Sequence, residues 1–263
     1  MHRQTIRLAA CGTFLLLTAA SCQRKEAGRC DRPARQTIVF YDQSASSVAD
    51  PATLAMFGDT MNALVQSGLE CHGDAVRGFL VHERTRSKAE RVDVENRVPP
   101  LGDTLRMSTL IRSQAVLDYN QRTDSLRADG AARLASLFTM NVAPEYRRHT
   151  DLIGTLEVIG DEVAKADSGS TIRVVYLGDM HESMPPPRRD FDRQPPATID
   201  EAEAWANADT VVLRDLRVDR DQLARVEVRV LLGSLALRPA APEIRRYWER
   251  LFANAGIPKV QYN

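Results

Sequence analysis

Three oxygen-bearing side chains follow directly on a run of strand-forming residues near the start of the chain. Asp42, Ser44 and Ser46 stand at alternate positions after Thr37-Ile-Val-Phe-Tyr. The apolar run predicts a buried strand, so a carboxylate and two hydroxyls would meet where that strand ends. A small divalent cation takes oxygen ligands, keeps several waters and needs few carboxylates. The spacing therefore indicates a site for Mg²⁺ or Mn²⁺.

A second acid, Asp179, ends another strand-forming run, residues 171–179. Strands alternate with helices along the chain, which predicts an α/β fold: a doubly wound, mostly parallel central sheet with helices on both faces. Sheets of this kind bind ligands beyond the carboxyl ends of their strands, where the strand order reverses. Because Asp42 and Asp179 both end strands, we expect them at the same edge of the sheet.

The remaining elements are predicted from apolar periodicity and from helix-start signals such as Asp50-Pro51. A proline-rich stretch, residues 184–196, predicts a long exposed loop after Asp179. The predicted strands are 37–41, 77–82, 91–95, 171–179, 225–232 and 259–262, and the predicted helices are 51–68, 108–138, 150–166 and one opened by Pro242.

These residues resemble the von Willebrand factor A domain with its metal-ion-dependent adhesion site. In that family an Asp-x-Ser-x-Ser loop, a Thr before a later helix and an Asp after the fourth strand together hold Mg²⁺. Asp42, Ser44 and Ser46 match the first element, Thr150 the second and Asp179 the third. The resemblance implies a non-enzymatic binding module, in which an open position on the ion accepts a carboxylate from a partner protein.

The sequence departs from the family pattern at two positions. His149 and Met180 stand where the family usually has Gly. Two alternatives therefore remain beside the binding module. One is a metal-assisted hydrolase with His181 or Glu182 as general base, and the other is an envelope scaffold with a degenerate site. The Gly-x-Ser-x-Gly and His-Glu-x-x-His motifs of other hydrolases are absent from the sequence.

The N-terminal segment is typical of an export signal. Arg3 and Arg7 precede an apolar stretch, residues 8–20, which small residues join to Cys22. The pattern resembles a bacterial lipoprotein signal, which implies that Cys22 is acylated and becomes the mature N-terminus. Gln23 follows that cysteine, which by analogy favours the outer membrane, with the domain facing the periplasm.

One domain, residues 36–263, would then follow the signal, residues 1–21, and a polar flexible tether, residues 22–35. About 240 of the 263 residues remain after the signal, which suits a single α/β domain. The 35 basic and 35 acidic residues cancel, so no net charge favours nucleic acid as a partner.

The cysteines indicate a disulfide. Of the four cysteines, Cys11 is lost with the signal and Cys22 would carry lipid, which leaves Cys30 and Cys71. Because disulfides persist outside the cytoplasm, these two are a candidate bridge rather than a metal pair or a nucleophile.

Overall fold

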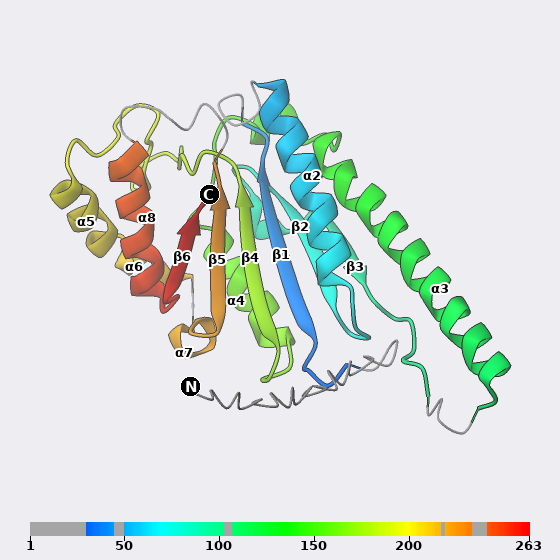
Figure 1. Ribbon diagram of the computed structural model, residues 1–263. Coiled ribbons are helices and arrows are strands. Elements are labelled where there is room, and N and C mark those ends of the chain that lie inside the picture. Colours follow the sequence, from blue (N-terminus) through cyan, green and yellow to red (C-terminus); the bar gives the residue numbers. More distant parts are fainter. Residues whose placement is uncertain (1–29, 45–49, 103–106, 217–218, 233–240) are drawn as a thin grey trace, which may run out of the picture.

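The computed structural model describes residues 30–44, 50–102, 107–216, 219–232 and 241–263. These residues form a six-stranded sheet with the order β3-β2-β1-β4-β5-β6, in which only β3 runs antiparallel to its neighbour (Figure 1). The fold is therefore the expected doubly wound α/β type. The strands are β1 (Arg35–Asp42), β2 (Ala75–Val81), β3 (Arg91–Glu95), β4 (Thr171–Leu177), β5 (Val226–Leu231) and β6 (Lys259–Tyr262).

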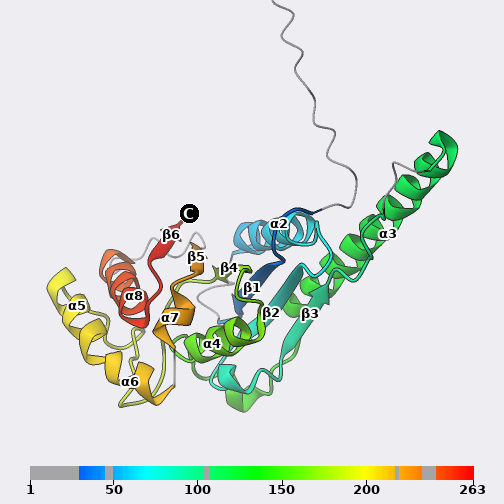
Figure 2. The ribbon, with the colours of Figure 1, turned by 90° about the horizontal axis from the view of Figure 1, so that it is seen from below.

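Helices cover both faces of the sheet, as Figure 2 shows from the amino ends of the parallel strands. Side chains from α2 and α3 pack on Val39 and Tyr41 of β1, whereas those from α4 and α8 pack against the opposite face, where Ile38 and Phe40 lie. The helices are α2 (Pro51–Gly68), α3 (Thr109–Ala135), α4 (Thr155–Lys165), α5 (Ile199–Ala208), α6 (Thr210–Asp215), α7 (Arg220–Leu223) and α8 (Ala241–Ala255), with short 3₁₀ turns η1 (Thr85–Ser87), η3 (Ser136–Phe138) and η4 (Pro144–Tyr146).

The strand order reverses between β1 and β4. The chain moves outward from β1 to β2 and β3, then returns to the other side of β1 to form β4, β5 and β6. Residues Tyr41 and Leu177 are paired in register, so Asp42 and Gly178 follow side by side at the carboxyl edge. This edge is where a doubly wound sheet binds its ligands.

Local sequence signals explain the better-predicted elements. Asp50 caps α2 by accepting hydrogen bonds from the backbone N–H groups of Ala52 and Thr53, and Pro51 occupies the first turn. The apolar stripe of that helix, which includes Phe57, is buried against the sheet. The edge strand predicted at 91–95 is confirmed with the same bounds.

The structure shifts several of the predicted boundaries, and two of them lie next to the candidate site. The helix expected at 150–166 begins only at Thr155, because residues before it bond to the loop that follows β4. The strand expected to end on Asp179 ends at Leu177. Helices α5, α6 and α7 were not predicted from the sequence.

A disulfide joins Cys30 to Cys71 with a Cα–Cα distance of 5.8 Å, as expected. Next to it, the Arg32 guanidinium donates to both carboxylate oxygens of Asp74, at 2.9 and 2.7 Å. Residues 30–35, which were expected to belong to the flexible tether, are therefore fixed to the domain at the amino-end rim of the sheet. The expected signal, lipidation site and first part of the tether lie outside the described residues. None of the helices in the described ranges is both long and apolar enough to cross a bilayer.

Candidate metal centre

The first two predicted metal ligands lie at the carboxyl end of β1. Asp42 is the last residue of that strand and is 3% exposed. The Ser44 N–H donates to Asp42 Oδ1 at 2.8 Å, and the Ser44 hydroxyl contacts Asp42 Oδ2 at 3.0 Å. This turn keeps the carboxylate and the hydroxyl together at the edge of the sheet. Ser46, the third residue of the motif, lies outside the described residues.

Gly178 brings the loop that carries Asp179 against Asp42. A Cβ atom on Gly178 would lie 2.7 Å from the Asp42 Cβ and 3.4 Å from its Oδ2, so a side chain at this position would collide with the acid. Asp179 is the next residue, and it is 5% exposed. Its Oδ1 accepts the His181 N–H at 3.1 Å. Asp42, at the end of β1, and Asp179, two residues after the end of β4, therefore belong to adjoining segments.

Thr150 is held beside the same loop. Its N–H donates to Ser183 Oγ at 2.9 Å, while the Ser183 N–H donates to the Thr150 carbonyl at 3.1 Å. The ring of His149 contacts the Ser183 carbonyl at 2.7 Å. Residues 149 and 150 are thus bound to Ser183, which lies four residues after Asp179. Neither Ser183 nor this pairing was recognised in the sequence, because the two segments are more than 30 positions apart.

A buried ion cluster lies beneath these loops. Arg188 donates to Asp151 Oδ1 at 2.6 Å and also to Glu182. Glu182 Oε2 accepts the N–H groups of Leu152 and Ile153 at 2.6 and 3.1 Å. The carboxylates are 1% and 0% exposed and the Arg188 side chain is 12% exposed. The cluster therefore fastens the segment after Thr150 to the segment after Asp179.

Burial raises the pKa of Glu182 to about 8, although Arg188 and the N–H of Ile153 favour its charged form. All of its contacts donate to it, and its oxygens are fully enclosed. The Glu182 carboxylate is thus occupied as a structural group. His181, the other residue considered as a general base, is 8% exposed and contacts Asp192 Oδ1 at 3.2 Å.

The proline-rich loop is less exposed than its composition predicted. Besides Arg188, its Arg189 forms two hydrogen bonds with Asp209, at 2.8 and 2.9 Å. Asp209 also accepts the Tyr247 hydroxyl of α8 at 2.8 Å. Both arginines therefore neutralise acids of this chain, and the stretch Pro185–Pro187 stays exposed between fixed ends.

Met180, which stands where the resemblance predicted Gly, adopts a left-handed backbone conformation. Its φ is +59°, in the left-handed region. The Trp248 Nε1 of α8 donates to the Met180 carbonyl at 2.7 Å, and the Met180 side chain is buried. Packing and a hydrogen bond thus hold a non-glycine residue in the conformation that glycine adopts readily.

The donor set suits a small hard cation. Asp42, Ser44, Thr150 and Asp179 offer only oxygen atoms, which are the ligands that Mg²⁺ and Mn²⁺ prefer. Within the described ranges, no group of three or more His, Cys, Asp or Glu residues is arranged to hold a metal, and this set contains two such residues. A cavity of about 20 Å³ opens beside Asp179, and Arg245 and Tyr262 also line it. The other candidate ligands, Asp42, Ser44 and Thr150, do not line this cavity, so it is distinct from the candidate metal site.

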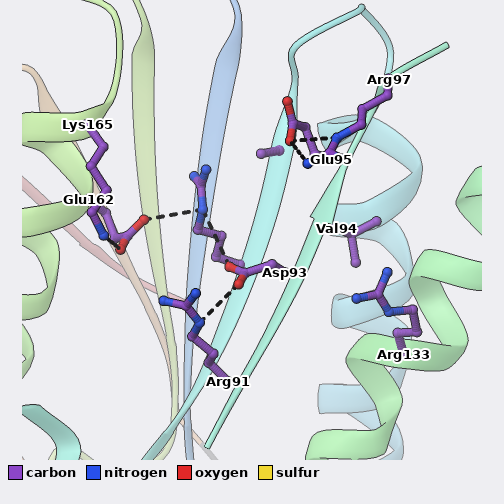
Figure 3. A pocket seen from close by; sticks show the side chains of 10 residues that line it. Arg91, Asp93, Val94, Glu95, Arg97, Arg133, Glu162 and Lys165 are labelled. Atoms are coloured by element: carbon purple, nitrogen blue, oxygen red, sulfur yellow. Dashed lines mark hydrogen bonds and ion pairs between the residues drawn. The ribbon is translucent and has the colours of Figure 1, made fainter. Parts of the chain in front are cut away.

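A larger hollow, of about 570 Å³, lies near the amino end of β2 (Figure 3). Its carboxylates pair with its own cations: Glu162 with Arg77 at 3.2 Å and Lys165 at 2.7 Å, and Asp93 with Arg91 at 3.0 Å. We therefore assign it no ligand. The lining residues are Ala75, Arg77, Arg91, Asp93, Val94, Glu95, Arg97, Arg133, Glu162 and Lys165.

Comparisons with known proteins give structural neighbours alone. No family model matches the sequence, and no curated protein matches it. The fold is similar to proximal thread matrix protein 1 from the mussel byssus, with a TM-score of 0.38 and 12% identity, over 88% of this chain and 44% of that one. It is also similar to the pilus adhesin SpaC of Lactobacillus rhamnosus GG, with a TM-score of 0.40 and 12% identity, over 90% of this chain and 28% of that one. This chain thus spans less than half the length of either neighbour, and similarity this low says nothing of its function.

Proposed function

We propose that this protein is a membrane-anchored, metal-dependent protein-binding module of the bacterial cell envelope, of the von Willebrand factor A type. The observation that carries the proposal is the close packing of Gly178 on Asp42, at the edge where the strand order reverses. It joins two predicted metal-binding segments that are about 135 residues apart in the sequence.

In this proposal Asp42 and Asp179 supply the charge, and the hydroxyls of Ser44, Ser46 and Thr150 complete the protein ligands. A bound Mg²⁺ or Mn²⁺ would supply a cationic centre with an open coordination position for a carboxylate of the partner protein. Two carboxylates leave that centre without net negative charge, so an acidic side chain of the partner is not repelled. The exposed stretch Pro185–Pro187, close after Asp179, would contribute to the choice of partner.

The hydrogen bonds of Glu182 favour a binding function over metal-assisted hydrolysis. Both of its oxygens are engaged by backbone N–H groups and by Arg188, so it is poorly suited to take a proton from water. These hydrogen bonds support a binding role for the edge of the sheet.

Titration of the purified protein with Mg²⁺ and Mn²⁺ by calorimetry tests the metal site directly. We expect saturable binding with one ion per chain. Asp42→Ala and Asp179→Ala should each weaken it by at least about tenfold, because each removes a direct ligand. Asp200→Ala is the matched control, since this acid is exposed on α5. Ion binding that is absent, or that survives both substitutions together, would reject the site and leave the fold intact.

Capture of partner proteins with Mg²⁺, followed by release with EDTA, tests the binding role. Partners held by the edge of the sheet should be lost with EDTA and with Asp42→Ala, and retained by Asp200→Ala. Partners that bind equally well in EDTA would contradict the proposed mode of binding.

The proposed envelope location rests on Cys22, with its lipid in the outer membrane. Replacing Cys22 by Ala should move the protein from the membrane fraction to the soluble periplasm. An unchanged distribution would contradict the lipid anchor without affecting the metal site.

A further inference from the structure

The N-terminal part of α3 extends beyond the body of the domain (Figures 1 and 2). Tyr119 is the first buried residue of that helix, which begins at Thr109. Ten residues therefore precede the first buried position, and at 1.5 Å per residue they extend about 15 Å. Of the helices in the described ranges, α3 is the longest, yet only its C-terminal part is packed closely on the sheet.

This projecting end carries large apolar side chains in contact with solvent. Leu110 is 81% exposed, Ile111 is 59% exposed and Leu117 is 53% exposed. Leu110 and Leu117 are seven positions apart and thus lie about 20° apart around the helix, with Ile111 on the flank. The segment 98–102, in which Pro99 and Pro100 are also exposed, lines a hollow with another side of the same helix, at Ala115, Asp118, Tyr119 and Arg122. Such a cluster indicates an interaction surface.

The same end lies at the rim where the chain enters the domain. The disulfide fixes Cys30 to Cys71, and the neighbouring His72 ring contacts the Val98 carbonyl at 3.2 Å. The segment that starts at Val98 then leads towards α3. In Figure 1 the start of β1 and the N-terminal end of α3 both lie at the bottom. Asp42, the last residue of β1, belongs to the opposite end of the sheet.

We infer that the N-terminal end of α3, together with residues 98–102, is a membrane-contact surface that rests on the bilayer to which the protein is anchored. We call residues 98–102 and 109–118 the α3 tip. The inference rests on the proposed lipid anchor at Cys22, and it adds a second contact with the same membrane. The occupant of the apolar surface is thus the lipid headgroup and upper acyl-chain region.

The length of the tether supports this occupant. Cys22 and Cys30 are 30 − 22 = 8 residues apart, so even a fully extended chain spans at most about 29 Å. The amino-end rim therefore stays within that distance of the bilayer, and the N-terminal end of α3 lies level with this rim (Figure 1). Leucine and isoleucine side chains of a helix that lies against a bilayer can enter its headgroup and upper acyl-chain region.

The charges near the α3 tip agree with a phospholipid surface. Arg112 lies within the tip and Arg122 lines the hollow beside it, whereas Asp118 is the acid in this part of the helix. Asp118 accepts a hydrogen bond from the Gln114 side chain at 2.7 Å. Residues 107–122 therefore carry no net negative charge that would repel anionic headgroups.

Tryptophan fluorescence of the lipidated protein in vesicles tests the inference. The vesicles contain phosphatidylethanolamine and phosphatidylglycerol with brominated acyl chains, which quench nearby indoles. Leu110→Trp adds a probe to the α3 tip, and Val211→Trp is the matched control, because Val211 is 60% exposed on α6. Wild-type protein gives the background of Trp205 and Trp248. We expect quenching of the Leu110→Trp probe in brominated vesicles and none of the control.

Other outcomes overturn the inference in distinguishable ways. Protein that floats with the vesicles while both probes are quenched equally would reject the α3 tip and keep the anchor. Protein that does not float would reject both. A concentration-dependent blue shift of the Leu110→Trp probe without vesicles would assign the surface to a second copy of the chain. Addition of EDTA should leave the quenching unchanged, because the candidate metal site lies at the opposite end of the sheet.

Discussion

Removing Arg188 is expected to destabilise the domain more than any exposed charge substitution. Its guanidinium is the cation that lies between Asp151 and Glu182, both of which are fully buried. In Arg188→Met the aliphatic volume is roughly kept and the charge is lost. Asp151 and Glu182 would then lose the cation buried between them, and breaking a buried ion cluster in this way costs about 3–5 kcal/mol of unfolding free energy.

The loss of unfolding free energy in Arg188→Met should increase as the pH rises. Burial already raises the pKa of Glu182 to about 8, whereas the unperturbed value is 4.5. The folded state therefore holds a proton that the unfolded chain releases, and stability falls as the pH rises from about 4.5 to about 8. Without Arg188 the pKa of Glu182 rises further. The variant thus keeps losing stability above pH 8, where the wild type no longer does, and its deficit is larger at about pH 9 than at about pH 7.

Urea unfolding at these two pH values measures the effect, with the transition midpoint and slope fitted together. Arg193→Met is the matched control, since Arg193 is 85% exposed and pairs with Asp190 on the surface. We expect a change below about 0.5 kcal/mol for this control. A loss of less than about 1 kcal/mol for Arg188→Met, or a deficit that shrinks as the pH rises, would refute the assignment of the cluster as the fastening between the two loops.

Three further substitutions test the packing around the site and the rim. Gly178→Ala should lower the unfolding free energy by about 1–3 kcal/mol and weaken ion binding, because its Cβ would strike Asp42; unchanged calorimetric titration and unfolding curves would contradict this. Cys30→Ser should lower the unfolding free energy by about 2–4 kcal/mol, measured by urea unfolding without reductant. Reduction of the wild type should lower it by a similar amount, and a smaller loss in the variant would count against the bridge. Trp248→Phe should cost about 1–3 kcal/mol, since it orphans the buried Met180 carbonyl; a neutral thermal melt would exclude that role.

The sequence predicted those parts of the fold whose signals are local. The apolar run before Asp42 is a central strand, and central strands of parallel sheets are buried on both faces, so their sequences are continuously apolar. Asp50 and Pro51 mark the start of α2 by capping chemistry alone. Because the carboxyl ends of parallel strands share one edge of a sheet, the placement of Asp42 and Asp179 at the same edge could be anticipated.

The supporting contacts of the site could not be predicted, because they join segments that are distant in sequence. Arg188 lies among prolines and was expected to be solvated, yet Asp151 and Glu182 bury it. The start of α4 was misjudged for the same reason. Glu182 and Ser183 accept hydrogen bonds from the backbone N–H groups of Thr150, Leu152 and Ile153. This segment therefore follows the loop after β4 rather than the helix that its apolar pattern favours.

The two proposed surfaces lie at opposite ends of the same strands. The rim with Cys30 and the α3 tip belongs to the amino ends of the parallel strands, whereas Asp42 and the loop after β4 belong to the carboxyl ends. β1 has eight residues, which span about 26 Å at 3.3 Å per residue. A domain that rests on a membrane by its α3 tip would therefore present the candidate metal centre away from the lipid, where a soluble or opposing envelope protein can reach it. Separation on this scale also exceeds the screening length of about 8 Å at physiological salt, so substitutions at one surface leave the electrostatics of the other unchanged.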